Sequence, residues 1–244
     1  MRKIAVIALL AASACSAQVK VLASNGVKAA LEAMKPAAEK AAGQPLVIEW
    51  GSSAALKKAI AAGEAFDVAI LTPEATADMI KAGKIAAGSA VDMAHTGIGF
   101  GIRAGAAKPD ISTPDAVKQT LLKAKSISIV KEGASRATVD RMFDKLGVAA
   151  AVASKTELTD GTETSGEHVS EGKAEIEIVP LSEVPLVHGV EILGPLPGDL
   201  QNTLHFQASL GASAKAAAGA KKVIQYLTSP AAEPVLRSKG MEPK

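Results

Sequence analysis

Apolar strand-like runs alternate with helical patterns along the first half of the chain. Four of these runs end in a turn that carries Ser or Thr and leads directly into a helical pattern. The runs lie at residues 19–24, 46–50, 68–71 and 127–130, and the helical patterns lie at about 27–42, 54–62, 73–82 and 136–146. Strands that alternate with helices predict right-handed βαβ units and a parallel sheet.

Residues typical of helix ends support these boundaries. Thr72-Pro73-Glu74 combines an N-cap residue, a proline at the first helical position and an acid in the first turn. The clearest helical periodicity has apolar residues at i, i+3, i+4 and i+7, namely Val139, Met142, Phe143 and Leu146. Pro36 interrupts the first helical pattern, so we expect a kink or a restart there.

A long extended run, at residues 91–103, has glycines at alternate positions and suits a connection between two lobes. Strand and helix patterns resume beyond it, and further extended runs at 189–193 and 204–210 predict a return connection. We therefore expect an α/β fold with two lobes, each a mixed, mainly parallel sheet flanked by helices. Lobe 1 would comprise residues 18–95 and 206–244, lobe 2 would comprise 96–205, and a two-segment hinge would join them.

The N-terminus predicts export from the cytoplasm. Arg2 and Lys3 precede an apolar stretch at 4–12, and small residues follow up to Ala17, which is the pattern of a signal peptide at residues 1–17. A second interpretation takes residues 12–15 as a lipobox that would lipidate Cys15. Because Cys15 is the one cysteine of the chain, the folded protein has no disulfide. Both interpretations place the protein in the periplasm, either free or lipid-anchored.

Charge and composition narrow the class of ligand. The chain has 27 Lys and Arg residues and 25 Asp and Glu residues, and two of the basic residues lie in the leader, so the remainder is balanced. A balanced charge argues against nucleic acid or an anionic membrane as partner. Aromatic residues make up only 2% of the chain, which disfavours sugars and nucleobases because these ligands usually stack on aromatic rings. We expect a monomer with no membrane span after the leader.

Hydroxyl side chains stand where the predicted strands end. The carboxyl ends of parallel strands meet at one edge of a sheet, and helix N-termini favour anions. Any one of these residues could be only a helix cap. Together they favour a shared site for a small anion, in which we assign Ser24, Ser52 and Ser135 to the ligand and Thr72 to capping.

Two arginines are further candidates. Arg136 starts a helical pattern, where a positive charge opposes the helix dipole. Its side chain is either solvated or a bidentate clamp on a carboxylate or a larger oxyanion. Arg103 follows the long extended run and is a second candidate. If both reached the site, an organic carboxylate or phosphonate would be favoured over a tetrahedral oxyanion.

The sequence contains no recognisable motif for a metal site, a cofactor site or a catalytic site. The four histidines are scattered, with no i, i+4 pair and no cysteine beside them, which argues against a metal site. The sequence has no nucleophile elbow, phosphate loop or paired carboxylates in a catalytic setting. We therefore expect no cofactor and no enzyme activity, and Asp67 is interpreted as a structural carboxylate.

Several segments resemble a known family in their order along the chain. These are the strand-Ala-Ser-helix junction at Ser24, the Gly-Ser-Ser turn at 51–53, Gly-Glu-Ala-Phe-Asp-Val-Ala-Ile at 63–70, Glu-Gly-Lys-Ala-Glu-Ile-Glu-Ile-Val at 171–179, and the chain end at 227–243. The chain is similar here to the molybdate-type periplasmic substrate-binding proteins of ABC importers, over nearly all of residues 18–244.

The resemblance implies a type II binding protein whose two lobes close on a tetrahedral oxyanion held by backbone N–H groups and hydroxyls. It matches Ser24 and Ser52 to the hydroxyls of the first lobe, Ser135 to the second lobe, and residues 161–164 to a region of backbone donors. The chain departs from the family at Asn25, which replaces an apolar residue, and at Pro180, where Tyr is common. The expected ligand-binding residues are Ser24, Asn25, Ser52, Ser53, Arg103, Ser135, Arg136 and Thr162.

The resemblance further implies the function of a solute-binding protein of an ABC importer. Its partners would be a small anion resembling molybdate and a permease in the membrane. Three alternatives remain: an organic carboxylate or phosphonate bound through Arg103 and Arg136, a sensor or adhesion module that has lost its ligand, and a secreted enzyme on the same fold.

Overall fold

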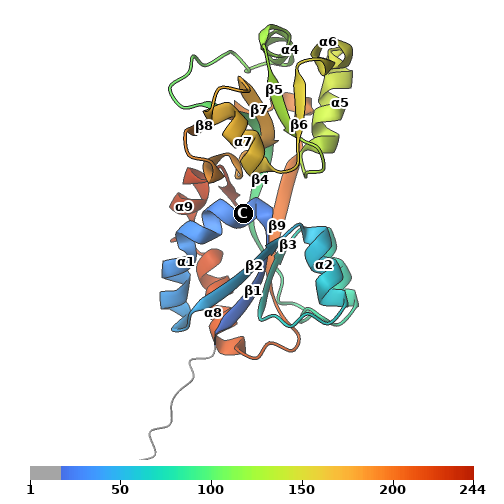
Figure 1. Ribbon diagram of the computed structural model, residues 1–244. Helices are drawn as coiled ribbons and strands as arrows, with labels where there is room; N and C mark the ends of the chain where they lie inside the picture. Colours follow the sequence, from blue (N-terminus) through green and yellow to red (C-terminus); the bar gives the residue numbers. More distant parts are fainter. Residues whose placement is uncertain (1–17) are drawn as a thin grey trace, which may run out of the picture.

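The computed structural model describes residues 18–244, so the expected signal peptide at 1–17, with Cys15, lies outside the described residues. Two lobes lie one above the other and are joined by strand β4 (Val91–Arg103) and by the segment that enters β9 (Thr203–Leu210) (Figure 1). The predicted two-lobed α/β fold is confirmed. No helix within residues 18–244 is long and apolar enough to cross a membrane.

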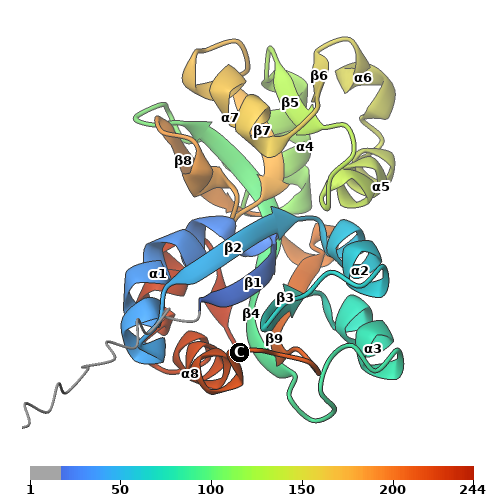
Figure 2. The same ribbon diagram turned by 60° about the horizontal axis from the view of Figure 1, so that its bottom comes forward.

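Lobe 1 is built on a mixed sheet in the order β2-β1-β3-β9-β4. Strand β1 (Val19–Ser24) runs parallel to both β2 (Leu46–Gly51) and β3 (Val68–Leu71). Strand β9 runs antiparallel to β3 and to the first part of β4, and β10 (Glu242–Pro243) adds a short antiparallel pair to β4. The parallel strands therefore end together at the edge that faces lobe 2 (Figure 2).

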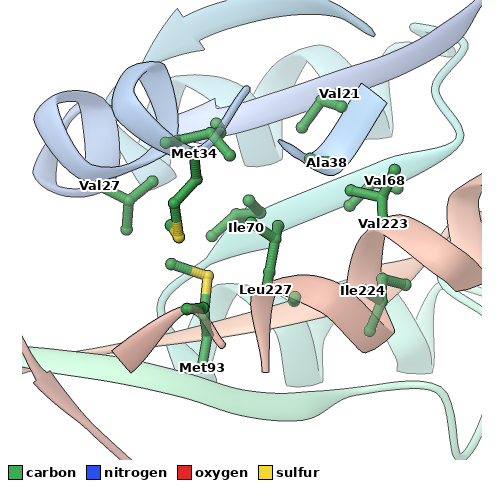
Figure 3. Close-up of a cluster of buried hydrophobic side chains, with 14 of the residues drawn as sticks. Val21, Val27, Met34, Ala38, Val68, Ile70, Met93, Val223, Ile224 and Leu227 are labelled. Carbon is green, nitrogen blue, oxygen red and sulfur yellow. The ribbon is translucent and has the colours of Figure 1, made fainter. Parts of the chain in front are cut away.

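Helices cover both faces of this sheet because successive strand residues point to opposite sides. Val19, Val21 and Ala23 of β1 pack with α1 (Lys28–Ala42), α8 (Ala217–Leu227) and α9 (Glu233–Ser238). Leu22 packs on the other side with α2 (Ser53–Ala61) and α3 (Pro73–Lys81). Within the first cluster, Met34 of α1 and Met93 of β4 point toward each other (Figure 3).

Lobe 2 repeats the plan with a second sheet in the order β4-β7-β5-β6, and β8 pairs with the other side of β4. Strand β5 (Ile127–Val130) is parallel to β6 (Thr156–Thr159) and to β7 (Ile176–Pro180), whereas β4 is antiparallel to β7 and to β8 (Val190–Pro195). Apolar residues from one face of this sheet pack with α4 (Pro114–Lys123), α5 (Arg136–Leu146) and α6 (Ala149–Ala153), and α7 (Thr162–Ser170) covers the other face.

The long strand β4 belongs to both sheets. Its residues up to Gly97 pair with β9, and from Ile98 onward they pair with β7 and β8. Its alternate glycines admit close neighbours: a Cβ on Gly97 would lie 2.8 Å from Nε2 of Gln201, and a Cβ on Gly101 would lie 2.6 Å from Oε1 of Glu177. The glycine pattern therefore reflects crowding around the connection between the lobes.

The structure differs locally from the sequence-based expectation. Helix α1 continues without interruption through Pro36, and Pro36 and Glu32 are both exposed, so water can reach the Glu32 carbonyl that proline leaves without a helical partner. Helix α6 and strand β10 were not predicted; each is five residues or shorter and has little periodicity of its own.

A candidate ligand-binding cleft between the lobes

A cleft with a volume of about 990 Å³ lies between the lobes. Lobe 1 lines it with residues that follow β1, β2 and β3, together with Leu204 and Phe206 of β9. Lobe 2 lines it with residues that follow β5 and β6, and with the turn after β7. The strand ends that the sequence singled out thus meet in one space, as the topology of parallel strands requires.

Helices begin around this cleft. The 3₁₀ helix η1 (Asn25–Val27) leads into α1, and residues from the first turn or N-cap of α2, α5 and α7 also line the cleft. The first N–H groups of a helix have no partner within the helix, and the helix dipole adds partial positive charge there. The cleft is therefore suited to an anion.

Three serine hydroxyls of lobe 1 line the cleft. The side chain of Ser24 is 6% exposed and has no hydrogen bond within residues 18–244. The hydroxyl of Ser52 accepts the Ala55 N–H at 3.1 Å, and that of Ser53 accepts the Thr72 N–H at 3.1 Å. A hydroxyl that accepts one bond keeps its own hydrogen, so all three serines can donate to a ligand.

Two other predicted residues of the first lobe also line the cleft. Asn25 follows Ser24 and begins η1. Thr72, which was assigned to capping, accepts the Ala75 N–H at 3.5 Å at the start of α3. Its hydroxyl is therefore engaged in the way its sequence context predicted.

Ser135 does not lie where we expected. Its side chain is 1% exposed and is not part of the cleft lining, although its neighbours Ala134 and Arg136 are. The chain turns at 133–136, with the Arg136 N–H bonded to the Gly133 carbonyl, and Ser135 is already in a helical conformation. Because of this turn, the Ser135 side chain faces inward while its neighbours reach the cleft.

Arg136 lies on the cleft and Arg103 does not. Nε of Arg136 donates to both carboxylate oxygens of Asp140, at 3.0 and 2.9 Å. This pair one turn along the helix explains how a basic residue is tolerated at a helix start. No bond from the two terminal nitrogens of Arg136 to any residue of 18–244 is present, so they remain for a ligand.

Arg103 lies at the far end of β4, so the expectation that it joins Arg136 was wrong. Together with Lys123 and Asp110, it lines a second cavity of about 760 Å³, between the 104–110 loop and α4. The thirteen-residue length of β4 carries its last residue away from the lobe junction.

A carboxyl group that the sequence did not single out lies in the cleft beside Thr162. The Thr162 hydroxyl donates to Oε2 of Glu183, which follows β7 in the turn after Pro180. Burial of the carboxyl raises the pKa of Glu183, the Thr162 bond opposes this rise, and the nearby charge of Glu163 adds to it. Glu183 reaches the cleft because the turn that carries it packs against α7, and no residue pattern in the sequence indicates this contact.

One pair of charged residues joins the two lobes. Nζ of Lys28, the first residue of α1, lies 2.7 Å from Oε1 of Glu163 in α7. The bond to Glu163 raises the pKa of Lys28. Among the ion pairs of residues 18–244, this is the one that spans the cleft.

A comparison with known protein families agrees with this architecture. Residues 19–242 match the family of bacterial extracellular solute-binding proteins. The chain belongs to this family. The similarity to molybdate-type binding proteins expected from the sequence is confirmed at the level of the fold.

Individual relatives differ in what their names describe. An aconitate isomerase of Pseudomonas sp. is 30% identical over 229 residues, which cover 91% of this chain and 87% of the relative. The periplasmic molybdate-binding protein of Azotobacter vinelandii has a TM-score of 0.71 and 18% identity, covering 91% of this chain and 98% of its own. The sulfate-binding protein SubI of Mycobacterium tuberculosis H37Rv has a TM-score of 0.64 and 16% identity, covering 93% and 86%. At these identities the two structures show the fold alone.

Proposed function

We propose that this solute-binding protein takes up a small organic polycarboxylate in the interlobe cleft. The observation that carries the proposal is the position of Arg136, whose terminal nitrogens are unpaired within residues 18–244 and which lies on the same cleft as the serine hydroxyls. A guanidinium holds a carboxylate through two parallel hydrogen bonds. Helix N-termini around the cleft supply further donors for a second or third carboxylate.

Two further features support an organic acid. The relative with 30% identity is named for aconitate, a tricarboxylate. A volume of about 990 Å³ also leaves room for a ligand larger than a tetrahedral oxyanion.

A tetrahedral oxyanion is the second candidate. Ser24 and Ser52 lie on the cleft, and proteins named for molybdate and sulfate share the fold. In this case the anion would be held by hydroxyl and backbone donors, and Arg136 would contribute little.

Titration calorimetry and thermal shift separate the two candidates. The mature protein would be titrated with trans-aconitate, cis-aconitate and citrate, and in parallel with molybdate, tungstate, sulfate and phosphate. We expect micromolar binding and a raised Tm with the tricarboxylates. A response confined to the inorganic anions would establish the second candidate, and no response to any of them would refute an anion site.

The partner and location follow from the same proposal. The ligand-bound protein would dock on an ABC permease in the membrane and would act as a monomer in the periplasm. The signal peptide would be removed after Ala17, or Cys15 would carry a lipid. Cell fractionation and the intact mass of the exported protein distinguish these two N-termini.

A further inference from the structure

We propose that Glu183 makes the cleft a proton-transfer site that shifts the double bond of a bound unsaturated polycarboxylate. The proposal rests on the polycarboxylate site proposed above. It adds an activity, because binding alone requires no group that can take up and return a proton.

The geometry gives the two oxygens of Glu183 different roles. Oε2 accepts the hydroxyl of Thr162, which fixes the carboxyl group at the start of α7. Oε1 has no hydrogen-bond partner within residues 18–244, and the residue lines the cleft with Leu186 and Phe206. One oxygen is therefore held by the protein and the other is left for a ligand.

The surroundings of Glu183 are suited to the removal of a proton from a carbon atom of the ligand. A free glutamate is a weak base at neutral pH, and partial burial makes Glu183 a stronger one. The charge of Glu163 adds to the rise in the pKa of Glu183, and the carboxylate of Glu163 is itself paired with the ammonium of Lys28 across the cleft. The buried Glu177 is a further carboxyl group whose charge interacts with that of Glu183. Arg136 and the helix N-termini supply the positive charge that a deprotonated substrate needs.

The reaction balances without a cofactor. In an acid such as aconitate, a CH₂ group lies between a carboxylate and the double bond. Glu183 takes one proton from this carbon, and the electron pair that remains spreads over the allylic system and its carboxylate. The double bond moves by one position as the protonated Glu183 returns the proton to the far carbon, which restores the carboxylate. Nothing is oxidised or reduced, and the cis and trans isomers interconvert.

The experiment combines binding with hydrogen exchange. The mature protein is incubated with trans-aconitate in D₂O and followed by ¹H NMR, while calorimetry measures its affinity for the same compound. We expect deuterium uptake at the CH₂ group and formation of the cis isomer. Glu183→Gln should slow both by about 100-fold or more while the Kd changes by about threefold or less.

Two further variants sharpen the result. Glu167→Gln replaces an exposed carboxylate of the same helix, outside the cleft lining, and should leave the exchange unchanged. Thr162→Val removes the bond to Glu183 and should move the pH dependence of the rate toward higher pH, because that bond lowers the pKa of Glu183.

The outcomes separate this inference from the proposed function. Binding of trans-aconitate with no exchange would overturn the proton-transfer role and leave the solute-binding function intact. Exchange that persists fully in Glu183→Gln would show that Glu183 is not the base. Failure of trans-aconitate to bind would overturn the polycarboxylate site, and the proton-transfer role with it.

Discussion

The ammonium group of Lys28 lies 2.7 Å from a carboxylate oxygen of Glu163, on the opposite lobe. The two residues are 135 positions apart in the sequence, so the pair forms only when the lobes approach. We therefore expect the pair to stabilise the arrangement in which the lobes approach each other and to favour ligand binding.

We predict that Lys28→Met and Glu163→Gln each weaken ligand binding by about 2- to 5-fold, because both side chains are partly exposed and such pairs contribute little. The charge-swapped double variant Lys28→Glu with Glu163→Lys should recover part of the loss, as measured by calorimetry. The control is Lys57→Met, which breaks a pair with Asp78 inside lobe 1. Tighter binding by Glu163→Gln would show instead that Glu163 competes with the ligand for Lys28.

The second prediction concerns the two arginines. Arg136→Ala should raise the Kd by about tenfold or more, because hydrogen bonds to charged groups contribute about 1.5–3 kcal/mol. Arg103→Ala should leave the Kd unchanged, since Arg103 lines the other cavity. Calorimetry measures both, and an unchanged Kd in Arg136→Ala would favour a site made of hydroxyl and backbone donors.

Two hydroxyls at strand ends should behave in opposite ways. Ser24→Ala should weaken binding and leave stability unchanged, because the Ser24 hydroxyl bonds to nothing within residues 18–244. Thr72→Ala should lower the free energy of unfolding by about 1 kcal/mol and leave affinity unchanged, because it removes a helix cap. Urea denaturation and calorimetry of both variants test this, and a loss of stability in Ser24→Ala would contradict the assignment.

The buried carboxyl group of Glu177 should make the stability of the protein depend on pH. Glu177 is fully buried on β7, neither of its carboxylate oxygens has a hydrogen-bond partner among residues 18–244, and burial raises its pKa to about 7. Between about pH 4.5 and pH 7 the unfolded chain has lost this proton while the folded protein keeps it. The free energy of unfolding should therefore fall as the pH rises through this window, by about 3 kcal/mol.

Glu177→Gln should remove this contribution and make the protein more stable than wild type at pH 8. Urea denaturation at pH 5 and pH 8 measures the difference. Glu175→Gln is the matched control, because Glu175 precedes the same strand and accepts the Lys125 N–H at 2.8 Å. Equal pH dependence in wild type and Glu177→Gln would contradict the prediction.

Much of the fold could be read from the sequence because its signals are local. The periodicity of Val139, Met142, Phe143 and Leu146 marks the buried face of α5, and all four are buried. The alternate glycines of residues 97–101 mark the connection between lobes, although their cause, contact with Gln201, Gly194 and Glu177, is tertiary. Pro36 was misleading because an exposed helix position tolerates proline when water reaches the freed carbonyl.

The cleft was predicted in part for a similar reason. Ser24, Asn25, Ser52, Ser53, Arg136 and Thr162 lie on it because topology alone places strand ends together. Glu183 and the Lys28–Glu163 pair were not found, because a raised pKa and a contact across lobes exist only after packing. The placement of Ser135 and Arg103 depended on one turn and on one strand length, which no residue pattern specified.

The strand pairing also bears on how such a protein can change its ligand. Lobe 2 is a single unbroken stretch from Ile98 to Asn202, whose ends adjoin, with the Ile98 N–H 3.3 Å from the Asn202 carbonyl. Lobe 1 supplies the flanking stretches on both sides. The lobe 2 side of the cleft is thus encoded by one continuous segment of the gene. Recombination at its two adjacent borders would exchange Arg136, Thr162 and Glu183 together. Such an exchange would combine a new set of lobe 2 cleft residues with an unchanged lobe 1.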